Sequence, residues 1–186
     1  MIRVGDRLHN PVTLEDFTFL ETNRQTNGAR TRVRISLPPR APGVFLHLHT
    51  TYTEHFLVLE GQLTMIAGDP KQPFVLSAGQ SQLVPLRTVH RFWNDSDAPV
   101  TFEVEIQPAR QFEESIETLF ELANLGRVKP DGSPEHPFDL AFLAQMSESY
   151  LPGPPVWVQR ALFALVAGVA RLVGYRVLPA PRRTSS

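Results

Sequence analysis

The stretch that decides the fold is residues 43–61, GVFLHLHTTYTEHFLVLEG, in which two histidines and a glutamate lie among apolar residues. His47 and His49 are two residues apart, so on a β-strand their side chains point to the same face. The residues after His49 can carry the chain into a second strand that begins near Glu54 and returns the carboxylate to the same pocket. Two imidazoles and a carboxylate at one point are typical of an octahedral metal site with open positions.

A strand-like pattern continues on both sides of this stretch. Short segments that alternate or run apolar are separated by turn residues such as Pro38-Pro39, Gly68-Asp69-Pro70 and Asn94-Asp95. Strands of this length at regular spacing predict an antiparallel sandwich or barrel. The expected strands are Arg32–Leu37, Val44–His49, His55–Glu60, Leu63–Ala67, Phe74–Leu76, Gln82–Val84, His90–Trp93 and Val100–Ile106.

A second segment, residues 79–94, holds Gly79, Pro85, Arg87, His90 and Asn94. The two segments resemble the paired motifs of the cupin superfamily. The first family motif is glycine, five residues, His-x-His, three or four residues, glutamate, six residues and glycine. The second is glycine, five residues, Pro-x-Gly, two residues, histidine, three residues and asparagine. The chain departs at two places, because Gly43 is two residues closer to His47 than the motif expects and Arg87 replaces a glycine.

This resemblance implies a mainly β protein with a cupin jelly-roll barrel of two antiparallel sheets over residues 30–108. Residues 1–29 are then an N-terminal extension and residues 109–186 a C-terminal helical appendage. The positions that match the family's metal ligands are His47, His49, Glu54 and His90. The implied cofactor is one divalent Fe, Mn, Ni or Co ion, with Zn also possible. The alternative is a cupin barrel that keeps these residues and works without metal. His55 is excluded because it should point to the opposite face.

Residues that alternate with the expected ligands define a candidate substrate pocket. Phe45 shares the face of the two motif histidines, Phe56 and Val58 share the face of Glu54, and Phe92 shares that of His90. Such a wall suits a small apolar or aromatic molecule with one or two oxygens. The alternative is that these side chains only fill the barrel. Arg87 is either a solvated turn residue or a cation at the pocket rim that holds a carboxylate or phenolate.

The resemblance to quercetinase-like cupins implies a metal-dependent enzyme, most simply an oxidoreductase of the dioxygenase type. Glu54 would then act as a base toward a substrate hydroxyl as well as a ligand. Two alternatives stay open: a metal-assisted cyclase or isomerase, and a binding module that senses or carries a small molecule without turnover.

After Pro108 the apolar period becomes helical. We expect helices at Phe112–Leu125, Phe138–Tyr150 and Val156–Tyr175, the first of them packed on the barrel. Residues 149–186 carry no acidic side chain and five arginines: Arg160, Arg171, Arg176, Arg182 and Arg183. The favoured interpretation of the last helix is packing on the barrel or in a homodimer. Peripheral membrane contact through residues 156–178 is the alternative.

Composition narrows the remaining possibilities. The chain has no cysteine, which excludes a disulfide scaffold, a thiolate zinc site and a cysteine nucleophile. Its net charge of -1 argues against electrostatic binding of nucleic acid. The first residues lack the apolar run of a signal peptide, so a cytoplasmic location is expected.

Overall fold

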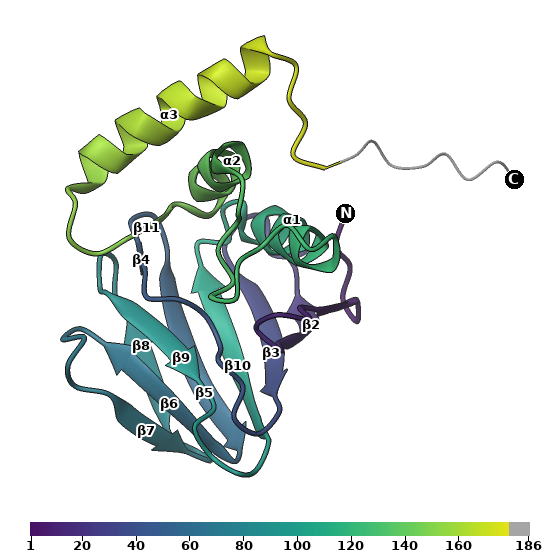
Figure 1. Cartoon of the computed structure of the whole chain (residues 1–186). Coiled ribbons are helices and arrows are strands. Elements are labelled where there is room, and N and C mark those ends of the chain that lie inside the picture. The colour runs from purple at the N-terminus through teal and green to yellow at the C-terminus, as the bar shows by residue number, and fades with distance from the viewer. Residues whose placement is uncertain (179–186) are drawn as a thin grey trace, which may run out of the picture.

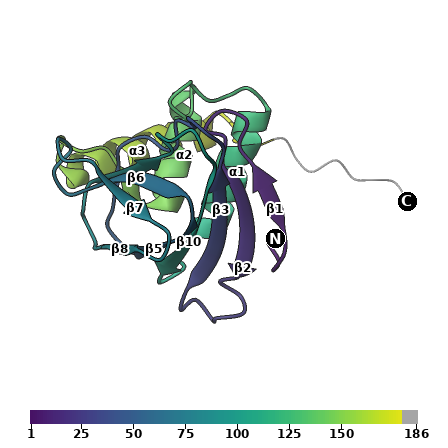
Figure 2. The same cartoon turned by 90° about the horizontal axis from the view of Figure 1, so that it is seen from below.

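The computed structural model describes residues 1–178 and shows a β-barrel with three helices gathered at one end (Figure 1). One sheet has six antiparallel strands in the order β1-β2-β3-β10-β5-β8, and a second has three in the order β7-β6-β9. Seen from below, β6 and β7 lie on the side of the barrel away from β1 and β2 (Figure 2). The predicted jelly-roll barrel followed by helices is confirmed.

Most of the expected strands and the three expected helices are present, but the second helix ends at Ser147, and Ser149 and Tyr150, expected at its end, form a strand instead. The strands are β1 (Arg7–His9), β2 (Asp16–Glu21), β3 (Thr31–Leu37), β4 (Leu48–His49), β5 (Thr53–Glu60), β6 (Gln62–Ala67), β7 (Phe74–Ser77), β8 (Ser81–Val84), β9 (His90–Trp93), β10 (Val100–Gln107) and β11 (Ser149–Tyr150). The helices are α1 (Phe112–Asn124), α2 (Pro137–Ser147) and α3 (Val156–Leu172).

The N-terminal residues belong to the barrel sheet, which differs from the expectation that residues 1–29 form an extension. Strand β2 pairs with β3, and β1 pairs with β2. Phe17 and Phe19 alternate along β2 and are buried in the same core as β3 and β10. Because these phenylalanines cover apolar surface of the barrel, the first strands are held by packing as well as by backbone hydrogen bonds.

The expected strand Val44–His49 is shorter in the structure. Only Leu48 and His49 form β4, preceded by a single bridge between His47 and His90. Gly43 has a φ of +60°, and a Cβ there would lie 2.0 Å from the carbonyl oxygen of Phe92. The backbone therefore passes so close to β9 that only glycine fits, and the chain straightens into a strand only after this point.

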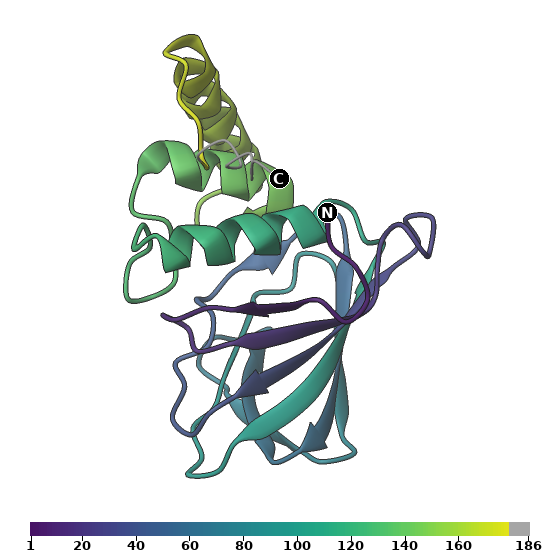
Figure 3. The same ribbon diagram turned by 90° about the vertical axis from the view of Figure 1, so that its right-hand side faces the viewer.

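Helix α1 closes the barrel. Its Phe112 and Phe120 are buried in the barrel core, and Ile116 and Leu119 pack against it. The carboxylate of Glu113 accepts a hydrogen bond from the hydroxyl of Thr31 at 2.7 Å, which ties the start of α1 to β3. Figure 3 shows α1 lying across the end of the barrel, with α2 above it and α3 outermost.

Helix α3 packs on α2 through a narrow face that includes Gln159, Ala167 and Ala170, which are buried. Its other side exposes large apolar residues, namely Trp157, Val158, Leu162, Leu165, Val169 and Leu172. No helix within residues 1–178 is long and apolar enough to cross a lipid bilayer. The homodimer and the peripheral membrane contact stay predictions, and Arg182 and Arg183 lie outside the described residues.

Candidate metal centre

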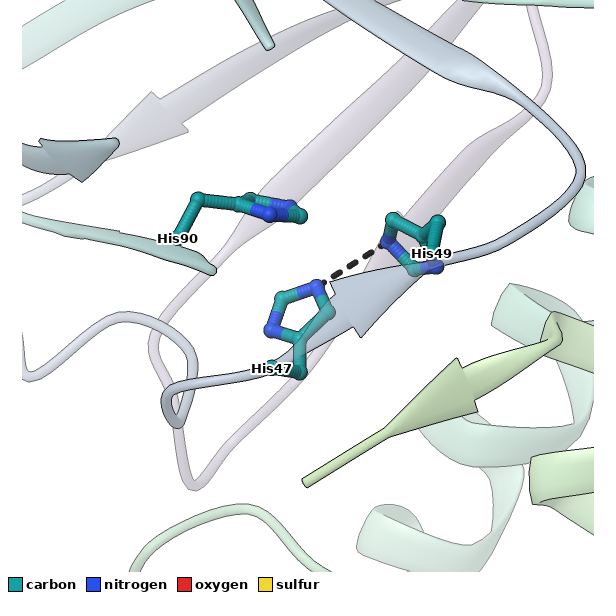
Figure 4. A group of neighbouring side chains, drawn as sticks. All are labelled: His47, His49 and His90. Carbon is teal, nitrogen blue, oxygen red and sulfur yellow. Dashed lines mark hydrogen bonds between the residues drawn. The ribbon is translucent and has the colours of Figure 1, made fainter. Parts of the chain in front are cut away.

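Backbone pairing brings the histidines of the two sequence segments together. The N–H of His47 donates to the carbonyl of His90 at 3.0 Å, and the N–H of His90 donates to the carbonyl of His47 at 2.8 Å. The rings of these two residues lie 4.3 Å apart, and the ring of His49 is 4.7 Å from that of His47. One ring nitrogen from each of the three histidines lies within 4.8 Å of the others (Figure 4).

Glu54 begins β5 and completes this cluster. Its two carboxylate oxygens lie 2.8 Å from Nε2 of His90 and 3.7 Å from Nε2 of His49. Among the described residues Nε2 of His90 is a buried atom that forms no regular hydrogen bond, and the Glu54 oxygen is its close charged neighbour. The structure thus places all four predicted ligands at one point and leaves a buried nitrogen there that a cation would satisfy.

The outer nitrogens of the three rings all have partners. Nδ1 of His47 and of His90 lies 2.8 and 2.9 Å from a backbone carbonyl oxygen, and Nδ1 of His49 lies 3.2 Å from the hydroxyl of Ser149. A carbonyl can only accept, so Nδ1 of His47 and of His90 carries a proton, and Nε2 is the nitrogen of each ring that would bind a cation. This is the arrangement in which histidines bind metals, with the other ring N–H held by a second group.

The electrostatics of the cluster favour neutral imidazoles at two positions. Burial, and then the neighbouring histidines, lower the pKa of His47 and of His49 well below the usual value. Burial also lowers the pKa of His90, but the Glu54 carboxylate outweighs it, so the pKa of His90 is raised. Three imidazoles and one carboxylate fit a divalent first-row transition metal, and this donor set leaves up to two octahedral positions for a ligand.

Two groups beside the cluster were missed by sequence reasoning. Tyr52 stacks on His49 with ring centres 4.2 Å apart, and its hydroxyl lies 3.2 Å from Nε2 of His49. The same hydroxyl donates to the carbonyl of Ser147 at 3.0 Å. Burial, and then the charge of Glu54, raise the pKa of Tyr52 well above its usual value, so this hydroxyl stays protonated.

The second missed group comes from the helical appendage. Strand β11 pairs with β4, so that Ser149 lies opposite His49. A two-residue strand has no periodicity, and Ser149 is 100 residues from its partner in the chain. No pattern in the sequence therefore signals this contact. The helical appendage therefore supplies part of the surroundings of the metal ligands.

A cavity of about 370 Å³ extends from the metal cluster into the space between the barrel and the helices. Its wall is mostly apolar and includes Phe45, Phe56 and Phe92 from the barrel. Helices α1 and α2 contribute Phe112, Ile116, Leu119, Leu140, Leu143 and Ala144. The volume lies within the range of small-molecule sites.

Two residues expected in the pocket lie elsewhere. Val58 is fully buried in the barrel core below the cavity, so it fills the barrel instead of lining the pocket. Arg87 is exposed and outside the cavity lining. Its φ is +64°, the conformation that the motif glycine would adopt, and its backbone N–H donates to the carbonyl of His49. Arg87 therefore supports the site through its backbone, while its side chain points into solvent.

Comparison with known proteins identifies the barrel. A family model described as "Cupin domain" matches residues 33–106. No curated protein matches the sequence. A solved structure of a predicted oxalate decarboxylase from Thermotoga maritima is 21% identical, with a TM-score of 0.49, and the match covers 58% of this chain and 98% of that one. An RmlC-like cupin from Shewanella frigidimarina is 19% identical, with a TM-score of 0.49, over 59% of this chain and 88% of that one.

Proposed function

The chain belongs to the cupin superfamily, and from this premise we propose that it is a metal-dependent enzyme that acts on a small apolar or aromatic molecule carrying oxygen, by a dioxygenase-type reaction. The observation that carries the proposal is the convergence of His47, His49, His90 and Glu54 at the end of an apolar cavity. A redox-active divalent metal held there supplies the means to bring dioxygen and an electron-rich substrate together.

The apolar residues around the ligands support binding of an apolar substrate. Phe45, Phe56 and Phe92 form an apolar wall next to the ligands, and α1 and α2 cover the opening of the barrel. A substrate that fills this apolar cavity would displace water from it, and this would strengthen the electrostatic interactions beside the ligands. The cavity therefore favours a substrate whose oxygens lie at one end and whose remaining surface is apolar.

Glu54 is the group that we propose as the base. Its carboxylate is buried beside the ligand cluster and lines the cavity, within reach of a hydroxyl of a bound enol or catechol. Proton loss from that hydroxyl makes the substrate easier to oxidise, so the position of Glu54 suits the start of the reaction. In the overall reaction the substrate is oxidised and both atoms of dioxygen enter the product, so that no separate reductant is required.

The test loads the purified protein separately with Fe(II), Mn(II), Ni(II) and Co(II) and measures oxygen uptake with a panel of aromatic enols and catechols. We expect uptake with at least one metal and incorporation of both atoms of labelled dioxygen into the product, seen by mass spectrometry. His55→Ala is the matched control, because His55 adjoins Glu54 but is exposed on the opposite face, and it should keep the activity that His90→Ala loses.

Two outcomes would contradict the proposal. Conversion of a substrate at the same rate without oxygen would mean that the metal acts only as a Lewis acid, as in a cyclase or isomerase. Tight binding of panel compounds without any turnover would indicate a module that binds a small molecule.

A further inference from the structure

A glutamate far from the metal ligands also faces the cavity. Glu15 precedes β2 and alternates with Phe17 and Phe19, and all three side chains are buried, with 2%, 3% and 0% of their surfaces exposed. Residues two apart on extended backbone share a face, so Glu15 stands in a row that otherwise consists of core phenylalanines. Its side chain lines the same cavity as His47, His49 and Glu54.

The Glu15 carboxyl has little to compensate its burial. The hydroxyl of Thr13 donates to Oε2 at 2.6 Å. Among residues 1–178 no basic side chain forms an ion pair with it, and Lys129 is the basic side chain that lines the same cavity. Burial raises the pKa of Glu15 to about 7, and the hydrogen bond from Thr13 only partly opposes this. A buried carboxyl without a cation lowers stability, so packing alone does not explain it, and such groups gather at functional sites.

Glu15 and the metal ligands lie at opposite ends of the cavity. The sheet order β2-β3-β10-β5 places Glu54 three strand spacings from the strand that follows Glu15, roughly 14 Å along the sheet. The cavity wall is mostly apolar and includes Phe17, Ile35, Val104, Ile116 and Phe120. The loop before α2 adds Lys129, Asp131 and Ser133 to the same wall. A single molecule that fills this space would therefore meet mostly apolar surface between the metal ligands and Glu15.

We propose that Glu15 is a specificity-determining residue that binds a hydroxyl group at the end of the substrate remote from the metal. A hydroxyl suits the position because it can donate to a carboxylate and accept from a carboxylic acid. The substrate class is then an elongated molecule with oxygens at one end, an apolar middle and a hydroxyl at the other. This inference rests on the proposed function, since it names the far end of the same substrate.

The test uses two matched catechols of equal length, one with an alkyl chain that ends in a hydroxyl and one whose chain ends in a methyl group. Binding to the metal-loaded protein is measured by calorimetry without turnover, in the absence of oxygen. We expect the wild-type protein to prefer the hydroxyl-ended compound by about tenfold or more, the value of one hydrogen bond to a charged or polar buried group.

Variants assign this preference to Glu15. Glu15→Leu should abolish it, because the replacement leaves nothing to bond the hydroxyl, and Glu15→Gln should keep most of it. Glu135→Leu serves as the matched control, since Glu135 is exposed and does not line the cavity, and should behave as wild type.

The outcomes separate the inference from the proposed function. Equal binding of both catechols by the wild-type protein overturns the role of Glu15, even if neither variant folds, and leaves the metal-dependent function standing. A preference that persists in Glu15→Leu also overturns it. If neither catechol binds, the inference and the proposed substrate class are both wrong.

Discussion

The two ends of the cavity each contain a buried glutamate, but the chain treats the two carboxyls differently. Glu54 lies among three imidazoles, two of which have an outer nitrogen held by a backbone carbonyl. Glu15 accepts one hydrogen bond, from the hydroxyl of Thr13, and forms no ion pair among the described residues, although Lys129 lines the same cavity. The Glu54 arrangement is a set of ligands that could share a cation, whereas the Glu15 carboxyl forms no ion pair among the described residues. Burial alone therefore does not reveal a carboxyl's role, because its partners decide what it can bind.

The largest effect should come from removing a ligand at the metal end. His49→Ala deletes one of four donors and should reduce metal affinity by at least about 100-fold, because each remaining ligand is spatially fixed and cannot replace it. Elemental analysis of protein purified without chelator or affinity metal should give close to one ion per wild-type chain and almost none for the variant.

If the two ends of the cavity act separately, a variant at the Glu15 end should keep its metal in the same measurement. Glu15→Gln should keep the full metal content, as should His55→Ala, whose side chain is exposed. Metal that survives both His49→Ala and His90→Ala would show that the ligands are elsewhere. Loss of metal in Glu15→Gln would show that the two ends do not act separately.

The difference between the two ends also explains what could be predicted from the sequence. His47 and His49 are two residues apart, His49 in β4 and His47 in the bridge before it, and this bridge pairs His47 with His90. The four ligand positions were therefore predictable from local spacing and the resemblance. Asn94, the last motif residue, is likewise explained, since its amide donates to the carbonyls of Pro38 and Ala98 and pins the loop beside β9.

No sequence spacing or motif pointed to the Glu15 end of the cavity. Glu15 precedes a strand in a segment that was expected to lie outside the barrel. The side chains of Glu15, Phe17 and Phe19 face the barrel interior only because β2 pairs with β3. A glutamate beside an aspartate looks solvated in sequence, and nothing local shows which of Glu15 and Asp16 is buried. Ser149 and Tyr52 were missed for the same reason, since tertiary packing alone brings them to His49.

The next largest effect concerns how Glu15 changes the free energy of unfolding with pH. The pKa of Glu15 is raised from 4.5 to about 7 in the folded protein. The folded state therefore holds a proton that the unfolded state has already lost between these values, and stability falls as pH rises from about 4.5 to 7. Glu15→Gln removes this penalty, so it should raise the free energy of unfolding by about 3 kcal/mol at pH 8.

Urea denaturation at two pH values checks this sign. The stabilisation by Glu15→Gln should be almost complete at pH 8 and mostly absent near pH 5, where the folded wild-type carboxyl is already protonated. A gain that is equal at both pH values would mean that the pKa of Glu15 is the same in the folded and unfolded states. A loss of stability at pH 8 would mean that a cation compensates Glu15.

The smallest effect on metal affinity should come from removing the hydroxyls of Ser149 and Thr13, which hydrogen-bond His49 and Glu15. Ser149→Ala removes the partner of Nδ1 of His49, and we expect about a tenfold loss of metal affinity, because such partners orient the ligand ring without binding the ion. Thr13→Val removes the hydrogen bond to Glu15 and should leave metal affinity unchanged. Competition with a coloured chelator measures both affinities under one condition. Since both variants remove one hydroxyl that bonds a buried side chain, similar losses in both would indicate a general loosening of the fold. An effect confined to Ser149→Ala would show that β11, from the helical appendage, helps to build the metal site.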